Sequence, residues 1–122
     1  MKRKIHSRTL VVLLSMLFII GLTPVAALAN TSTGIKVNGV DILNASNYTV
    51  ECGEGTAVYD PVANMLTLDN ATITRTDTQI PISFYNGDLT ILLKGENTIT
   101  TPTGGIVGYR GNVIFEGDGS LT

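Results

Sequence analysis

The stretch that decides the fold lies near the C-terminus, where GDLTILLKGENTIT (residues 87–100) is followed by a shortened copy, GNVIFEGDGSLT (residues 111–122). A weaker third copy, MLTLDNATIT (residues 65–74), lies upstream. Each copy consists of short β-forming runs separated by Gly, Asn and Asp. A period in the low to middle twenties with this composition predicts a β-solenoid, in which successive repeats stack their strands.

Two spacings describe the repeat. Tyr85 recurs 24 positions later as Tyr109, and Gly95 recurs 22 positions later as Gly117. Both spacings are even, so a residue and its copy are expected to point to the same side of their strands. The residues expected to point inward are Leu89, Ile91, Leu93, Ile99, Ile106, Val113, Phe115 and Leu121.

Residues 35–122 are therefore predicted to form one domain, a parallel β-helix of about three to four turns. A polar spacer, residues 30–34, precedes this domain. The turn spacing also permits a small antiparallel sandwich, although the internal repeat favours the solenoid. The repeat pattern still runs at Thr122, so we expect this chain to be the N-terminal portion of a longer surface protein.

Two local motifs predict turns before the repeats. Asn38-Gly39 lies between two short runs of alternating apolar and polar residues, which is the pattern of a β-hairpin. The segment DPVAN (residues 60–64) predicts a turn, because Pro sets its own φ while Asp and Asn side chains bind nearby backbone groups.

The N-terminal segment, residues 1–29, has the parts of a secretory signal peptide. A basic start (residues 1–10) is followed by an apolar run, VVLLSMLFIIGL (residues 11–22), which is too short to span a bilayer comfortably. Ala27-Leu28-Ala29 has the small-x-small pattern of a signal peptidase site. We expect cleavage after Ala29, a secreted or cell-surface protein and no membrane span after cleavage. An uncleaved membrane anchor is the alternative.

Removal of the signal leaves an acidic chain. Four of the 8 basic residues are lost and all 10 acidic residues stay, so the formal charge changes from −2 to −6. Nucleic acid is therefore not an expected partner, because phosphate binding needs clustered Lys and Arg. The single cysteine, Cys52, cannot form an internal disulfide. We expect it to be a half-buried apolar residue rather than a reactive or intermolecular thiol.

Three parts of the chain resemble a known family: GIKVNGVDIL (residues 34–43), YDPVANMLTLDNATIT (residues 59–74) and the two copies after residue 86. They resemble the repeats of secreted bacterial cell-surface proteins with carbohydrate-binding domains, which are similar to pectate-lyase-like right-handed parallel β-helices. The resemblance implies an all-β, right-handed parallel β-helix and a surface module for polysaccharide, in some relatives acidic polysaccharide with calcium. This chain departs from that pattern in its shortness.

A pair of acidic residues, Glu96 and Asp118, recurs with the same spacing as Gly95 and Gly117. In a parallel stack they would be neighbours at about 4.8 Å, where like charges repel unless a cation lies between them. Asn70 falls at the corresponding place upstream. We predict Glu96, Asp118 and Asn70 as a metal site, with calcium as the cation that suits these oxygens. The alternative is that both acids are solvated and point apart.

The recurring tyrosines, Tyr85 and Tyr109, each precede a glycine turn. Facing outward, they would form a ladder of two rings whose flat faces suit sugar rings, with Asp88 and Asn112 nearby for the hydroxyls. We predict these four residues as a carbohydrate-binding site. The alternative is a ladder that only stabilises the fold.

No catalytic residues are predicted. The basic residues after residue 29 are isolated, and none lies beside two acids on a shared strand face, as a lyase or glycosidase would need. We interpret the protein as a non-enzymatic module that binds carbohydrate or acts as an adhesin. The alternatives are a fragment of a polysaccharide lyase or hydrolase, and a structural N-terminal cap. An open apolar end at residues 113–121 would lead to end-to-end self-association or pairing with further repeats.

Overall fold

The structure is a computed structural model that describes residues 33–122, and its strands lie in three sheets. The first sheet has the order β10 (Ile106–Gly108), β7 (Ile82–Tyr85), β1 (Thr33–Val37), β2 (Val40–Asp41). The second has the order β11 (Val113–Glu116), β8 (Leu89–Lys94), β5 (Met65–Asp69), β4 (Gly55–Asp60), β3 (Thr49–Cys52). The third has the order β12 (Ser120–Leu121), β9 (Glu96–Thr100), β6 (Thr72–Thr74).

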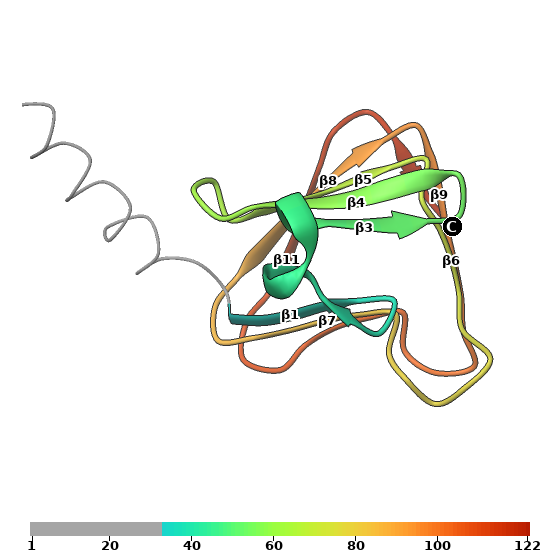
Figure 1. The fold of residues 1–122 in the computed structure, drawn as a ribbon, viewed down its shortest axis with the longest axis horizontal. Helices are drawn as coiled ribbons and strands as arrows, with labels where there is room; N and C mark the ends of the chain where they lie inside the picture. Colours follow the sequence, from blue (N-terminus) through green and yellow to red (C-terminus); the bar gives the residue numbers. More distant parts are fainter. Residues whose placement is uncertain (1–32) are drawn as a thin grey trace, which may run out of the picture. The chain divides into compact units, whose positions relative to one another are not determined.

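The three sheets pack their inner faces on one apolar core. In Figure 1, β1 and β7 lie below, β3, β4 and β5 above, and β6 and β9 at the right. Two short 3-10 turns, η1 (Ile42–Asn44) and η2 (Ser46–Tyr48), connect β2 to β3. The core comprises Ile35, Val37, Ile42, Val50, Cys52, Ala57, Tyr59, Leu66, Leu68, Ala71, Ile73, Ile82, Phe84, Leu89, Ile91 and Leu93. These residues all belong to one compact unit of the described chain.

The chain is all-β as expected, but the prediction of a right-handed parallel β-helix is wrong. The strands form three separate sheets, and two of these sheets have mixed strand directions. β1 is antiparallel to both β2 and β7, and β4 is antiparallel to both β3 and β5. For three of these pairs the physical reason lies in the connections, because the short turns between β1 and β2, β3 and β4, and β4 and β5 can only link antiparallel neighbours. The pairing of β1 with the distant β7 is set by tertiary packing.

Both predicted turns are confirmed. Asn38 and Gly39 have φ angles of 50° and 81°, so Val37 pairs directly with Val40 across a two-residue turn. In the second turn, Oδ1 of Asp60 accepts hydrogen bonds from the backbone N–H groups of Val62 (2.9 Å) and Ala63 (3.2 Å). The side chain of Asp60 thus holds the link between β4 and β5 in the way that Asx turns do.

The last two repeats pair in parallel with one constant offset, the same one that relates Tyr85 to Tyr109. Ile106 pairs with Ile82, Val113 with Leu89, and Ser120 with Glu96. The predicted shorter offset between Gly95 and Gly117 is therefore wrong, since Gly119 lies at the position equivalent to Gly95.

Close packing explains why a glycine occurs at position 117, which is not the position equivalent to Gly95. Gly119 N–H donates to the carbonyl oxygen of Leu93 at 3.0 Å, and a Cβ on Gly117 would lie 2.4 Å from that oxygen. Gly117 has a φ of 97° as well. A side chain is excluded there by the neighbouring backbone, so this glycine serves the turn rather than marking the repeat.

The expected inward alternation of β8 is confirmed, because Leu89, Ile91 and Leu93 are all buried. Their counterparts in the last repeat are less covered. Phe115 pairs with the fully buried Ile91, yet 52% of Phe115 is exposed. The difference follows from position, because β11 is the outermost strand of its sheet.

The two ends of the stacked sheets differ. At the end near β3, η1 contacts β1 and β4, and its Ile42 is fully buried. Figure 1 shows this short helical segment, coloured blue-green, between β1 and β3. At the other end, β10, β11 and β12 are the outermost strands of their sheets. The end near β3 is therefore bounded by the outermost strands β2, β3 and β6 and is also covered by η1, whereas the other end is bounded by β10, β11 and β12.

Candidate functional site: a groove beside two stacked tyrosines

A groove of about 400 Å³ follows β7 on the outer face of the first sheet. We call it the tyrosine groove. Its lining residues are Lys36, Gly39, Thr78, Gln79, Ile80, Ser83, Tyr85 and Tyr109. Lys36 and Val107 flank Ser83 on the neighbouring strands. Tyr85, two residues after Ser83, shares that outward face because side chains alternate along a strand.

The predicted tyrosine ladder is present in the structure. The ring centroids of Tyr85 and Tyr109 are 4.4 Å apart and the ring planes differ by 5°. The parallel pairing of β7 with β10, in which Ile82 lies beside Ile106, places the rings one above the other. The two side chains are 43% and 48% exposed, so the stack is reachable from solvent.

The two stacked rings leave less flat aromatic surface for a ligand than two separate exposed tyrosines would. One face of each ring is used by the other ring. A Cβ on Gly34 would lie 3.1 Å from Cδ2 of Tyr85, so β1 packs against the ring of Tyr85. What remains for a ligand is the edge of the stack and the face of Tyr109 that is turned away from Tyr85.

The groove contains a cation and no carboxylate among its lining residues. Lys36 is exposed on β1, and its cross-strand neighbour on β2 is Asp41. The carboxylate of Asp41 is engaged elsewhere, because it accepts hydrogen bonds from Leu43 N–H and from Asn44 Nδ2, both at 3.1 Å. In residues 33–122 the one ion pair is that of Arg75 with Asp77. Lys36 therefore lines the groove as a charged side chain, and it forms no ion pair with another described residue.

Arg75 braces the segment that forms one end of the groove. Its Nη1 donates to the carbonyl oxygen and to Oδ1 of Asn38, each at 3.2 Å. Its Nη2 donates to Oε1 of Gln79 at 2.9 Å and also pairs with Asp77. The hydrogen bond from Arg75 holds the pKa of Asp77 below its ordinary value. Gln79 is thus held against the β1–β2 hairpin before any ligand binds.

Asp88 and Asn112 lie outside the groove. Oδ1 of Asp88 accepts from the backbone N–H of Asn112 at 2.8 Å and from its Nδ2 at 3.2 Å. Asn64 Nδ2 in turn donates to the carbonyl oxygen of Asp88 at 2.7 Å. These residues form a polar ladder at the turn before β8, and they do not line the groove with the tyrosines.

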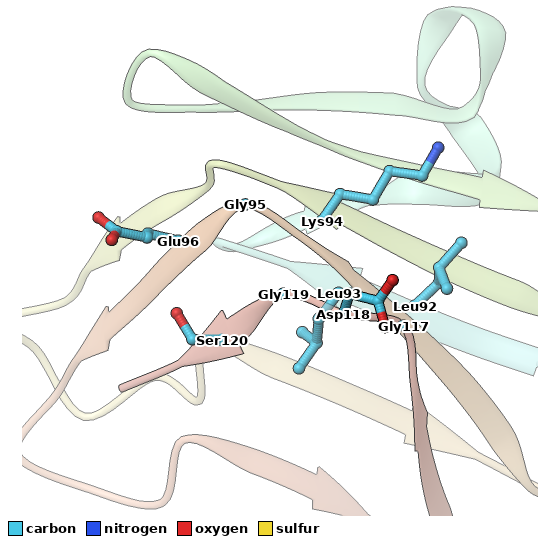
Figure 2. A pocket seen from close by; sticks show the side chains of 9 residues that line it. All are labelled: Leu92, Leu93, Lys94, Gly95, Glu96, Gly117, Asp118, Gly119 and Ser120. Atoms are coloured by element: carbon cyan, nitrogen blue, oxygen red, sulfur yellow. The ribbon is translucent and has the colours of Figure 1, made fainter.

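The three residues predicted for a metal site are only partly together. Oδ1 of Asn70 accepts from the backbone N–H of Glu96 at 3.1 Å. Glu96 pairs with Ser120 rather than with Asp118. A second hollow, of about 660 Å³, includes both Glu96 and Asp118 in its lining. Figure 2 shows their carboxylates on opposite sides of this hollow, pointing away from each other.

The register also sets the neighbours of Lys94. At the constant offset, Asp118 lies at the position equivalent to Lys94, and Glu116 pairs with Leu92. On its other side Lys94 pairs with Asp69. Asp69, Lys94 and Asp118 therefore lie in one row across the strands, with charges of alternating sign. The repulsion between like charges that suggested a bound cation does not arise in this row. No group of three or more His, Cys, Asp or Glu among residues 33–122 could hold a metal ion.

Lys36, Ser83 and Gln79 line the groove but were not predicted from the sequence as members of a site. Lys36 reaches the tyrosines because β1 pairs with β7, which lies far away in the sequence. No repeat spacing relates these two strands. A local signal existed only for Lys36, as the outward residue between two apolar ones before Asn38-Gly39.

Other predictions lie outside this surface. The predicted signal peptide falls on residues 1–29, outside the described residues, and β1 already begins within the predicted spacer, at Thr33. Cys52 is fully buried, and burial raises the pKa of its thiol. None of the described segments is a helix with the length and hydropathy needed to cross a membrane.

Comparisons with known proteins add no identification. No family model, no curated protein and no solved structure matches this chain.

Proposed function

We propose that this domain is a non-catalytic, secreted or cell-surface module that binds acidic polysaccharide in the tyrosine groove. The observation that supports the proposal is the lining of the groove. It combines the edge of two stacked aromatic rings with one lysine and with amide and hydroxyl side chains, and no carboxylate lines it.

The aromatic stack supports a sugar ligand. Tyrosine rings present apolar C–H groups and a hydroxyl together, and sugar rings have apolar faces edged by hydroxyls, so the two surfaces match. Ser83, Thr78 and Gln79 supply hydrogen-bonding groups along the same groove. Because Arg75 already fixes Gln79, little side-chain entropy is lost when a ligand binds there.

The lysine supports an acidic sugar. The chain after residue 29 has a formal charge of −6, so an anionic polymer is repelled from most of its surface. Lys36 is the exception on the outer face of the first sheet, and a sugar carboxylate can accept a charge-assisted hydrogen bond from its ammonium group. The groove thus favours a uronate residue over a neutral one.

The test is binding of residues 30–122 to polygalacturonate and to its neutral methyl ester, measured by calorimetry with and without a calcium chelator. We expect binding to polygalacturonate that weakens with salt and is lost on esterification. Lys36→Gln should weaken it by about 10- to 150-fold, since a charged hydrogen bond contributes roughly 1.5–3 kcal/mol.

Two matched controls locate the site. Lys94→Gln removes the same charge from the second sheet and should leave binding unchanged. Tyr109→Ala should abolish binding, whereas Tyr48→Ala, which changes an exposed tyrosine on η2, should not. Absence of polygalacturonate binding by the folded protein, or an equal loss with Lys94→Gln, would refute the proposal.

A further inference from the structure

Gln79 lines the end of the tyrosine groove next to the β1–β2 hairpin, and its side-chain amide has a fixed orientation. Oε1 of Gln79 accepts a hydrogen bond from Nη2 of Arg75 at 2.9 Å. A guanidinium group has donors only, so the amide nitrogen of Gln79 cannot replace the oxygen at this contact. The carbonyl oxygen therefore points toward Arg75, and the Nε2 group lies on the other side of the amide.

The neighbours of the amide keep it in this orientation. The guanidinium of Arg75 is itself fixed, because Nη1 donates to the carbonyl oxygen of Asn38 and Nε donates to Oδ1 of Asp77 at 3.1 Å. A Cβ on Gly39 would lie 3.2 Å from both Oε1 of Gln79 and Nη1 of Arg75, so the hairpin turn packs against this contact. The bonds that Gln79 forms with other described residues use Oε1 and the backbone N–H. Its two Nε2–H donors are thus available to a ligand.

Asp77, the carboxylate in contact with Gln79, is neutralised by Arg75. Oδ1 of Asp77 accepts from Nε of Arg75 and, at 3.2 Å, from the backbone N–H of Gln79. Oδ2 of Asp77 forms the ion pair with Nη2 of Arg75. Both oxygens are engaged, and the charge of the guanidinium offsets the charge of the carboxylate. The hairpin end of the groove therefore presents the N–H donors of Gln79 without an unpaired acid beside them.

The groove has two ends that a single sugar ring cannot reach together. Gln79 packs against Gly39 before the start of β7, whereas Tyr85 is the last residue of β7. β7 has four residues, and three steps along a strand cover about 10 Å. Lys36 lies between the two ends, because it pairs with Ser83 within β7. The arrangement suits a chain of at least two sugars better than one ring.

We infer that Gln79 is a specificity-determining residue of the tyrosine groove and that it recognises an acidic group of an oligouronide. This inference rests on the carbohydrate-binding function proposed above. The Nε2–H group donates to a carboxylate oxygen at the hairpin end, while another sugar of the same chain lies against the edge of the tyrosine stack. A carboxylate has acceptors only, so it fits an amide whose oxygen is already bonded. A neutral hydroxyl gains less there, because hydrogen bonds with a charged partner are stronger.

The experiment compares Gln79→Glu with the unchanged protein in calorimetric titrations with polygalacturonate. Both are prepared as residues 30–122, which contain every described strand. The introduced carboxylate can still accept from Arg75, so the midpoint of thermal unfolding should not fall. Its second oxygen cannot donate to a ligand carboxylate at neutral pH, so binding should weaken by at least about tenfold. A residue that only braced the segment would leave binding unchanged in this variant.

A matched variant separates the lost donor from the added charge. Thr76→Glu places the same charge on the same connection, at an exposed residue outside the groove lining, and should weaken binding by less than about twofold. In NMR spectra of the unchanged protein, the side-chain amide resonances of Gln79 should shift as trigalacturonate is added. Galacturonic acid alone should bind at least about tenfold more weakly than trigalacturonate, because it reaches only one end of the groove.

The outcomes distinguish this inference from the proposed function. Absence of polygalacturonate binding by the unchanged protein would refute the proposed function, and the role of Gln79 with it. Equal binding by the unchanged protein and by Gln79→Glu would overturn the role of Gln79 alone. So would equal losses for Gln79→Glu and Thr76→Glu, amide resonances that do not respond to trigalacturonate, or equal affinities for galacturonic acid and its trimer.

Discussion

Replacement of Asn97 is expected to be the most damaging change of a polar residue in this domain. Asn97 lies in β9 and only 1% of it is exposed. Its Oδ1 accepts from the backbone N–H of Ala71 at 2.8 Å, and its Nδ2 donates to the carbonyl oxygens of Lys94 and Ser120, each at 3.2 Å. One side chain thus satisfies backbone groups in three successive repeats, at the bend between the second and third sheets.

The cost of Asn97→Ala follows from these three bonds. Ala71 is 2% exposed, so its N–H group loses its partner in a buried place, which costs about 1–3 kcal/mol. The two carbonyl groups have further lone pairs and lie in exposed residues, so each loses about 0.5 kcal/mol. The expected total is about 3 kcal/mol, which lowers the midpoint of thermal unfolding by about 12–24 °C in a domain of this size.

Equilibrium urea unfolding, followed by circular dichroism, measures this cost. The matched control is Asn112→Ala, which removes an exposed side-chain hydrogen bond to Asp88 and should cost less than about 1 kcal/mol. A loss below about 0.5 kcal/mol for Asn97→Ala, at the bottom of the range for a single hydrogen bond, would refute the reasoning. It would mean that the freed N–H of Ala71 finds another partner or that water enters the bend.

Three further predictions concern the turns and the thiol. A Cβ on Gly55 would lie 2.0 Å from the backbone oxygen of Asn70, so Gly55→Ala should cost more than about 4 kcal/mol, and a stably folded variant in thermal unfolding would contradict this packing. Cys52 should react with a thiol reagent only on unfolding, since burial raises its pKa; rapid labelling of the native protein would be inconsistent with that burial. Asp77 should titrate in NMR below the ordinary range of aspartate and return to it in Arg75→Gln, because Arg75 lowers its pKa. The stability from this pair is present above the ordinary aspartate pKa and is lost as the pH falls through the lower folded value; equal titration in both proteins would argue against it.

The features that the sequence predicted correctly depend on neighbours along the chain. Asn38-Gly39 forms its hairpin because both residues adopt positive φ, which Asn and Gly tolerate best. Asp60 forms its turn through its own side chain. The alternation along β8 is a property of any half-buried strand. None of these conclusions required knowledge of which strands are partners.

The predictions that proved wrong concern strands whose pairing partners are distant in the sequence. The parallel β-helix was predicted to begin at residue 35, whereas hairpins replace parallel pairing in residues 35–60. Glu96 was matched to Asp118 by aligning Gly95 with Gly117, whereas the backbone aligns Glu96 with Ser120. A shift of two positions keeps the inward and outward sides and still moves every outward charge to a new neighbour. For this reason Glu96 and Asp118 are not the cross-strand neighbours that the repeat spacing predicted.

The sequence by itself determined the all-β class, the two turns, and the repeat spacing that stacks Tyr85 on Tyr109, because propensity, turn chemistry and repetition are written in short segments. Only the tertiary structure decided that β1 would bring Lys36 beside those tyrosines, and that η1 would cover one end of the core. These outcomes depend on packing between segments far apart in the chain. That packing is set by the free energy of the whole core, which no single segment contains.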